Sequence, residues 1–282
     1  MVKVGDKIFV ETNFREGNVG LIKLEEGAIL VNVPPSPAEV DRWLQELEEI
    51  NGGPLLYVVV TDCHPLRLLG LLKVPLPRIA HYNMREELLG ARSYYKLIFR
   101  ESYQKFYDGE PPETFEAFLP TLAFKGIMTL HRGRDIVKLI SASGPTSASI
   151  AVYLPRDKVL FAGALAVQGT HPDLRLALSG RWIRNLKRLK ALPVNTVIPG
   201  HGSPCGPEIF DKMIEYLTSV RRAVKEFYLA GKGRPDISRL VNNLLPLFPY
   251  PPEQEEEVRN LLKAGLSHLY DEIRARELKA TS

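Results

Sequence analysis

Residues 144–172 read GPTSASIAVYLPRDKVLFAGALAVQGTHP, and this stretch is the most informative part of the sequence for predicting the fold. It holds two apolar runs, residues 148–154 and 158–161, separated by the turn sequence Pro-Arg-Asp. Strand-like runs on both sides of a tight turn predict a β-hairpin. The loops before and after this hairpin are rich in glycine, and such loops at strand ends commonly carry binding residues.

Upstream of the hairpin, strand-like and helix-like segments alternate. Residues 28–33 and 55–61 are apolar runs of strand length, typical of strands covered on both faces. Between them, Ser36, Pro37 and Glu39 match a helix capping box, and apolar residues at helical spacing continue to Gly52. A strand, a helix and a strand in so short a stretch predict an α/β fold.

Two further helical segments are predicted around the hairpin. Residues 83–107 carry an aromatic stripe that we expect to pack on the core, and residues 180–191 form a basic amphipathic helix with a solvated charged face. The remainder is helical in three pieces. We predict an αβ/βα domain over residues 1–207 and a helical C-terminal extension over residues 208–282 packed on it. Apolar residues at helical spacing in this extension could bury a dimer face: Phe210, Met213, Leu217 and Val220.

Composition excludes several classes of protein. The 282 residues are 45% hydrophobic and 25% charged, which argues against a disordered chain. The net charge of +4 is too balanced for a nucleic-acid partner to be expected. No apolar run reaches membrane-spanning length, the N-terminus lacks a signal core, and two cysteines fit a reducing compartment, so we expect a cytoplasmic protein. The 22 prolines favour a heat-adapted chain.

Three loops hold residue types suited to chemistry. The first, TDCHPLRLLG at 61–70, places Asp62 and His64 two positions apart at a strand end, so both side chains can point the same way. The second loop is GPTSAS at 144–149, the start of the stretch quoted above. The third, IPGHGSP at 198–204, holds His201 between two glycines directly after a strand.

Together these loops resemble the metallo-β-lactamase fold superfamily. Residues 144–172 are similar to the family block GHTPGSIAVYLPEDKVLFTGD, residues 55–70 lie where the family has THxHxDHxxG, and VIPGHGSP at 197–204 is similar to its last histidine loop. The resemblance implies a four-layer αβ/βα sandwich with metals bound at one edge between the two sheets. It also implies a zinc- or iron-dependent hydrolase or oxidoreductase.

The sequence departs from the family pattern at most of the positions that hold metal ligands in the family. The positions that match the ligands of the first metal are Asp62, His64 and Pro145, and those of the second are Leu66, Arg67, Ala164 and His201. Only the two histidines keep the family residue. The proline, leucine and alanine offer no donor, whereas the arginine places a permanent cation at a ligand position. Asn32 stands where the family has a supporting aspartate.

These departures predict a catalytically silent member of the fold. Its remnant cleft, lined by Asp62, His64, Arg67 and His201, would bind an anionic small molecule or serve assembly as a homodimer or with an active relative. No cofactor is expected. The alternative is a hydrolase of the ester, lactone or thioester class, with one zinc or iron held by Asp62, His64 and His201.

Several individual residues have competing interpretations. Asp62 could form an ion pair with Arg67 or serve as a metal ligand. We expect His171 to be a solvated loop residue. The remaining polar candidates match no ligand position and are expected to be structural histidines or ordinary thiols: His81, His131, His268, Cys63 and Cys205.

Overall fold

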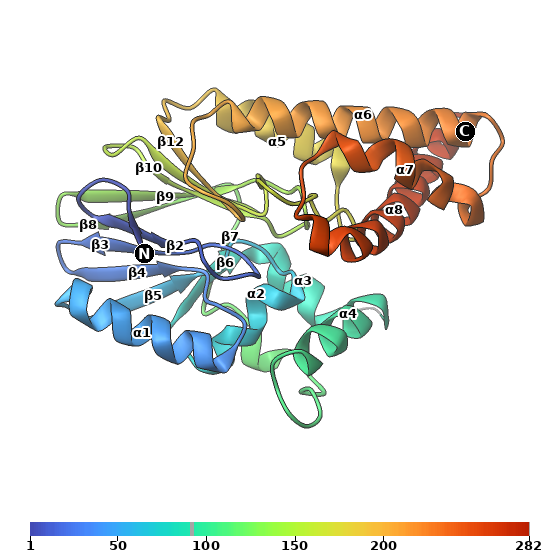
Figure 1. The fold of residues 1–282 in the computed structure, drawn as a ribbon. Helices are drawn as coiled ribbons and strands as arrows, with labels where there is room; N and C mark the ends of the chain where they lie inside the picture. The colour runs from blue at the N-terminus through green and yellow to red at the C-terminus, as the bar shows by residue number, and fades with distance from the viewer. Residues whose placement is uncertain (91–92, 282) are drawn as a thin grey trace.

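The computed structural model describes residues 1–90 and 93–281. Two β-sheets face each other, and helices cover the outer face of each sheet (Figure 1). The larger sheet has the strand order β1-β2-β3-β4-β5-β6-β7, and the smaller has the order β12-β11-β10-β9-β8. This helix–sheet–sheet–helix layering is the four-layer αβ/βα sandwich expected from the sequence.

The larger sheet is mixed. Strands β1 (Val2–Lys3), β2 (Ile8–Glu11), β3 (Val19–Leu24) and β4 (Gly27–Val31) pair antiparallel. Strands β5 (Leu55–Val59), β6 (Arg78–His81) and β7 (Leu122–Phe124) then extend the sheet in parallel from β4. Parallel neighbours need crossover connections, and helices supply most of them here.

Helices α1 (Pro37–Asn51), α2 (Pro65–Leu69), α3 (Tyr82–Leu89) and α4 (Ser93–Gln104) belong to this half, with 3₁₀ turns at Gly70–Leu72 and Glu116–Phe118. Helix α1 begins and ends as predicted, with Gly52 in the left-handed conformation at φ 64°. Ser36 makes no side-chain capping bond, so the capping box itself is wrong. The helix predicted over 83–107 is two helices, and its aromatic stripe packs on the core as expected.

The smaller sheet contains the hairpin that opened the sequence analysis. Strands β8 (Ile127–Arg132), β9 (Asp135–Ser141), β10 (Ile150–Leu154) and β11 (Val159–Gly163) pair antiparallel in that order. Helix α5 (Ser179–Lys190) then returns the chain to β12 (Thr196–Pro199), which lies parallel to β11. The β10–β11 hairpin is confirmed, with Val152 opposite Phe161.

Three apolar cores hold the layers together. The central core lies between the sheets and includes Ile29 and Val152. The outer cores are centred on Trp43 beneath α1 and on Trp182 beneath α5, and both indole side chains are fully buried. Burial of apolar surface on both faces of each sheet is the main stabilising contribution expected for such a fold.

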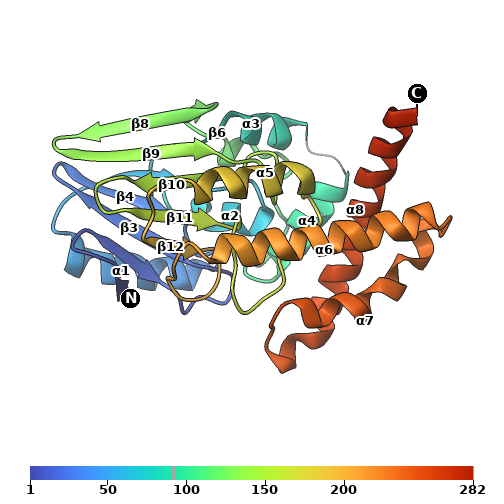
Figure 2. The ribbon, with the colours of Figure 1, turned by 90° about the horizontal axis from the view of Figure 1, so that it is seen from above.

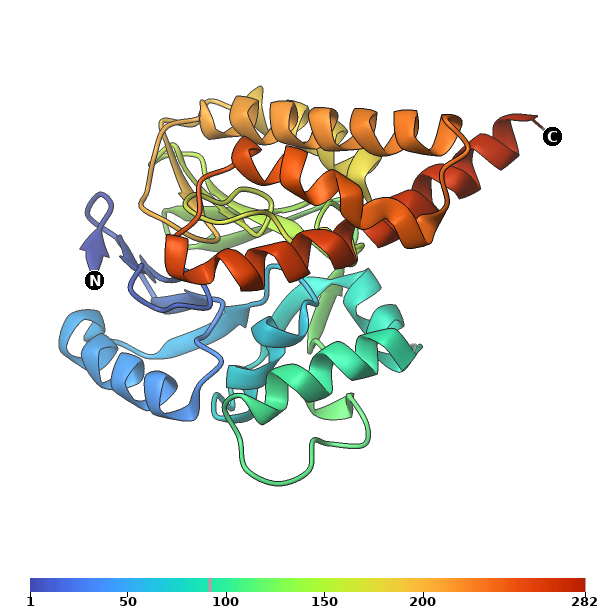
Figure 3. The same cartoon turned by 45° about the vertical axis from the view of Figure 1, so that its right-hand side comes forward.

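The C-terminal quarter is helical, as predicted. Helix α6 (Ile209–Leu229) is followed by a 3₁₀ turn (Arg234–Leu240), α7 (Val241–Leu244), two more 3₁₀ turns (Leu245–Leu247 and Pro252–Gln254) and α8 (Glu255–Thr281). Helix α6 runs alongside α5, and α8 crosses beneath it (Figures 2 and 3). In the described part of the chain, no helix is long and apolar enough to cross a membrane.

The proposed dimer face on α6 is already occupied. Four residues that we expected to be available for a partner are fully buried in the outer core of the smaller sheet: Phe210, Met213, Leu217 and Val220. The prediction of a dimer contact through them is therefore wrong. Helical spacing shows that a face is apolar, but it does not show whether the chain itself covers that face. The division at residue 207 stays a prediction.

Candidate functional site

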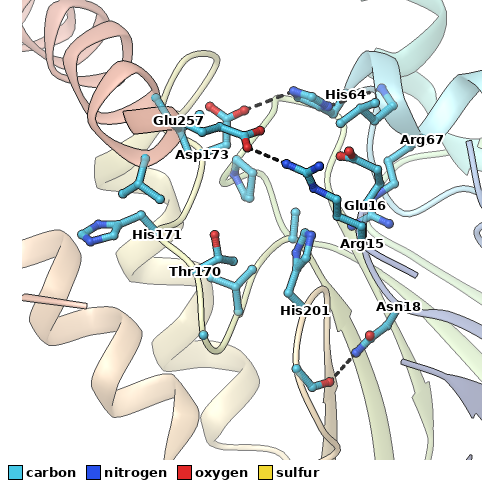
Figure 4. A pocket seen from close by; sticks show the side chains of 18 of the residues that line it. Arg15, Glu16, Asn18, His64, Arg67, Thr170, His171, Asp173, His201 and Glu257 are labelled. Atoms are coloured by element: carbon cyan, nitrogen blue, oxygen red, sulfur yellow. Dashed lines mark hydrogen bonds and ion pairs between the residues drawn. The ribbon is translucent and has the colours of Figure 1, made fainter. Parts of the chain in front are cut away.

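The three predicted loops converge on one cleft of about 380 Å³ (Figure 4). They follow β5, β9 and β12, and the loops after β2 and β11 and the start of α8 complete the walls. All four residues assigned to the remnant cleft lie on it: Asp62, His64, Arg67 and His201. The tertiary structure thus brings together side chains that are far apart in the sequence.

His64 is held by hydrogen bonds at both ring nitrogens. It caps the N-terminus of α2, where its Nδ1 accepts from the backbone N–H of Leu66 at 3.4 Å. Nε2 lies 3.1 Å from Oδ2 of Asp173. Because Nδ1 accepts, the neutral imidazole carries its proton on Nε2 and donates it to the carboxylate. Nη2 of Arg175 lies 3.3 Å from the same Nε2, so both ring nitrogens of His64 have polar neighbours within the protein.

Asp173 and Arg175 are functional-site residues that sequence reasoning missed. Nη2 of Arg175 donates to Oδ2 of Asp173 at 2.8 Å, and Nε lies 3.1 Å from the same atom. Burial by itself would raise the pKa of Asp173, but the hydrogen bond and charge of His64 and the charge of Arg175 outweigh burial and lower it. The carboxylate therefore stays ionised. Both residues follow the His-Pro pair at the end of the quoted stretch, where no spacing rule marked them.

Asp62 and Arg67 form a buried ion pair. Their side chains are 1% and 7% exposed, and Nε of Arg67 lies 3.8 Å from Oδ2 of Asp62. The other carboxylate oxygen accepts from the backbone N–H of His64 at 2.8 Å. Of the two interpretations left open by the sequence, the structure has the ion pair.

Gly17 makes room for the guanidinium. A Cβ added there would lie 2.8 Å from both terminal nitrogens of Arg67 and 2.7 Å from the carbonyl oxygen of Gly200. The φ of Gly17 is +124°, which side-chain-bearing residues rarely adopt. The β2–β3 loop can therefore pass over the arginine only with glycine at this position.

His201 is positioned by Asn18. The Asn18 side-chain amide donates to the carbonyls of Pro199 at 2.9 Å and Gly202 at 2.7 Å, and its backbone N–H donates to Gly200. Nδ1 of His201 is buried with no hydrogen-bond partner in the described residues. Burial first, and then the nearby charge of Arg67, lower the pKa of His201 to about 4. The imidazole is therefore neutral at pH 7.

Asn32 supports the strand end that precedes Asp62. It has a φ of 57° and is buried, and its Oδ1 accepts from the backbone N–H of Thr61 at 2.9 Å. Its Nδ2 donates to Oγ1 of Thr61 at 3.0 Å. The Asn32 amide thus donates one hydrogen bond to Thr61 and accepts another from it. Asn32 is not among the residues that line the cleft.

The positions of potential ligand side chains show whether the cleft could bind a metal ion. Within residues 1–90 and 93–281, no three side chains of His, Cys, Asp or Glu lie close enough together to hold a metal ion. Pro145, Leu66 and Ala164 line the cleft without a side-chain donor atom. Neither cysteine favours the thiolate form that binds metals, because burial raises the pKa of Cys63 to about 12 and of Cys205 to about 11.

The mouth of the cleft is bridged by an ion pair between distant segments. Nη2 of Arg15, in the β2–β3 loop, donates to Oε2 of Glu257 on α8 at 2.7 Å (Figure 4). Both side chains are more than half exposed, so this contact contributes little to stability. It shows that the C-terminal extension forms part of the cleft wall, which the sequence did not reveal.

His171 is buried, and the prediction of a solvated loop residue is wrong. Only 2% of it is exposed. Its Nε2 lies 3.0 Å from the carbonyl of Leu245, and its Nδ1 lies 3.0 Å from the hydroxyl of Tyr216. A carbonyl only accepts, so Nε2 carries the proton and Tyr216 donates to Nδ1. The C-terminal extension covers this loop, and nothing local in the sequence indicates that.

We expect His171 to make the stability of the protein pH-dependent. Burial lowers its pKa, and hydrogen bonds to the backbone of Leu245 and Phe248 oppose this only in part. The unfolded chain takes up a proton near pH ~6.5, before the folded chain does, so stability is lost as pH falls below that value. Urea unfolding at pH 7.5 and 5.5 measures the loss, which should shrink in His171→Phe.

The matched control is His131→Gln, because His131 is exposed on β8. It should leave the pH dependence unchanged. An identical loss of stability in wild type and His171→Phe would contradict the assignment.

Comparisons with known proteins agree with this architecture. The model of the metallo-beta-lactamase superfamily matches residues 12–201. A metallo-beta-lactamase from Pontibacter korlensis is 18% identical, with 77% of this chain and 97% of that chain covered and a TM-score of 0.60. The DIM-1 metallo-beta-lactamase exposed to ceftazidime is 19% identical, with 77% and 95% covered and a TM-score of 0.59. A search of curated proteins found no match.

At these identities the two solved structures show the fold alone. The family match is broader evidence, because it spans well over half of the chain and runs from the start of the β2–β3 loop to His201. It ends before α6, so the helices that cover His171 lie beyond it. The chain belongs to the metallo-β-lactamase superfamily.

Proposed function

We propose that this protein has lost the dinuclear metal centre and the hydrolase activity of its superfamily and keeps the cleft as a binding site for an anionic small molecule. The observation that carries the proposal is the buried guanidinium of Arg67. It takes a ligand position of the second metal and pairs with Asp62 at a ligand position of the first. Its charge also adds to burial, the larger cause, in lowering the pKa of His201. A fixed cation thus occupies the region where the superfamily holds metal ions.

The side chains present do not fit zinc or iron. A catalytic zinc needs three protein donors and an open position for water. Here Nε2 of His64 donates to Asp173, and the carboxylate of Asp62 faces Arg67. A divalent cation placed between them would be repelled by the guanidinium, which cannot lose its proton.

The alternative, one metal held by Asp62, His64 and His201, has no observation in its favour. It would require His64 to release Asp173 and Asp62 to release Arg67. Each release would leave a buried or half-buried charge without its partner, which is costly. Assembly with an active relative is likewise without support, since the expected helix face is covered.

Metal content tests the proposal directly. After equilibration with excess zinc and desalting, we expect the wild-type protein to retain well below one zinc per chain by elemental analysis. A variant that restores the superfamily ligands, with Asp62→His, Leu66→Asp, Arg67→His, Pro145→His and Ala164→Asp together, should retain more, because it supplies the missing donors.

The two possible outcomes separate a lost metal centre from a retained one. Retention of one or two zinc ions by the wild type, lost in His64→Ala, would overturn the proposal. Retention only by the restored variant, with circular dichroism showing both proteins folded, would support it.

A further inference from the structure

The cationic side chains of the cleft differ in how fully they are bonded. Arg175 donates to Asp173, and Arg15 donates to Glu257. Lys105 is exposed at the rim. Arg67 is the buried one, with 6% of the residue exposed. Arg67 is therefore the cation that the protein holds in a fixed, largely desolvated position.

The donors of Arg67 are mostly unused. A guanidinium has five N–H groups in a planar fork. Its contact with Asp62 is made through Nε at 3.8 Å, which is longer than a hydrogen bond. In the part of the chain that the structure describes, neither terminal nitrogen has a hydrogen-bond acceptor, and Arg67 is among the residues that line the cleft. Such a fork matches the two oxygens of a carboxylate.

Part of the cleft wall is apolar. Phe14, Leu66, Val258 and Leu261 line the cleft, from the β2–β3 loop, α2 and α8. The volume of about 380 Å³ lies in the range of small-molecule sites. An apolar chain attached to the anionic group would therefore displace water from an apolar surface when it binds.

The carboxylates of the cleft limit the charge of its occupant. Glu16, Asp173 and Glu257 line the cleft together with Asp62, and four cations face them: Arg15, Arg67, Lys105 and Arg175. The formal charges balance, and His201 is neutral. A second negative charge on the ligand would lie near these carboxylates. The remaining cation, Lys105, is exposed to solvent at the rim and is therefore strongly screened, so a polyanion is disfavoured.

We propose that the ligand is an amphiphilic monocarboxylate, with its carboxylate on the terminal nitrogens of Arg67 and its apolar chain along Phe14, Val258 and Leu261. This inference rests on the proposed function and names the class of anion. It assigns Arg67 as the residue that binds the head group and α8 as part of the binding wall.

Calorimetric titration of the metal-free protein with four probes tests the class. Octanoate should bind. Acetate, which lacks the chain, and 1-octanol, which lacks the charge, should each bind at least about tenfold more weakly, a difference of ~1.4 kcal/mol. Octyl phosphate, which has the same chain and more charge, should also bind more weakly than octanoate.

Variants test the placement. The double variant Asp62→Asn with Arg67→Gln removes the guanidinium without leaving an unpaired buried carboxylate, and it should weaken octanoate binding at least about tenfold. Glu16→Gln should strengthen binding, since it removes a rim carboxylate. The matched control is Lys3→Gln with Asp6→Asn, an exposed ion pair outside the cleft, which should leave the affinity unchanged.

The outcomes separate this inference from the proposed function. Tighter binding of octyl phosphate than of octanoate would overturn the monocarboxylate and leave an anion-binding cleft. Unchanged affinity in the folded double variant would overturn the role of Arg67. Failure of all four probes to bind would overturn the inference, and only zinc retention by the wild type would overturn the loss of the metal centre.

Discussion

Replacing Arg67 by leucine is expected to lower the free energy of unfolding by about 3 kcal/mol or more. The substitution leaves the carboxylate of Asp62, which is 1% exposed, without its cation. The carboxylate keeps the hydrogen bonds from the backbone N–H of His64 at 2.8 Å and from the hydroxyl of Thr61 at 3.4 Å, and neither partner carries a compensating charge. Urea unfolding at pH 7.5 measures the loss.

The second substitution Asp62→Asn should recover most of that stability. With both charges gone, the penalty for an unpaired buried ion disappears, and a neutral pair can be nearly as stable as the ion pair. The exposed pair Lys3–Asp6 provides the comparison, since breaking it should leave the free energy of unfolding almost unchanged. If Arg67→Leu alone were as stable as wild type, the Asp62–Arg67 pair would not be the fixed charge centre inferred for this cleft.

Replacing Trp182 by alanine is expected to cost about 4 kcal/mol, because it removes a fully buried indole from the outer core of the smaller sheet. Its Nε1 also donates to the carbonyl of Leu165 at 2.9 Å. The ring packs on Gly144, where an added Cβ would lie 2.9 Å from it. Trp182, which lies on α5, thus contacts two loops that line the cleft, the loop after β9 and the loop after β11.

Two controls separate packing from positioning of the cleft. Trp182→Phe keeps most of the apolar volume and loses the hydrogen bond, so its cost should be nearer 1–2 kcal/mol. Trp43→Ala empties the other outer core at a similar cost to Trp182→Ala, and it leaves the Gly144 loop in place. Octanoate affinity should fall in Trp182→Ala and stay unchanged in folded Trp43→Ala. Equal affinity in both would show that Trp182 acts on stability alone.

The strands and most helices could be predicted from local sequence. The hairpin at β10–β11 and helix α1 followed from runs of apolar residues, a tight turn and a glycine stop, all of which act over a few residues. The split between α3 and α4 was missed. The predicted stripe joined Leu88 of α3 to the aromatic residues of α4 at helical spacing, and that spacing does not mark the end of α3 at Gly90.

The contacts of the cleft could be predicted only in part. Asp62 and Arg67 lie five positions apart, just before α2 and on it, so their pairing could be considered from the sequence and is present in the structure. His64 was identified, but its partner Asp173 lies on another loop more than a hundred residues later. No local pattern connects the two.

Residue identity and short-range spacing were enough to predict the layered α/β fold, the three loops that meet at the cleft, and the absence of side-chain donors at Pro145, Leu66 and Ala164. They could not predict that Asp173 contacts His64, that α8 forms part of the cleft wall, or that α6 and its neighbours cover His171. Such contacts depend on which apolar faces pack together across the whole chain, and that is a property of the complete core rather than of any segment.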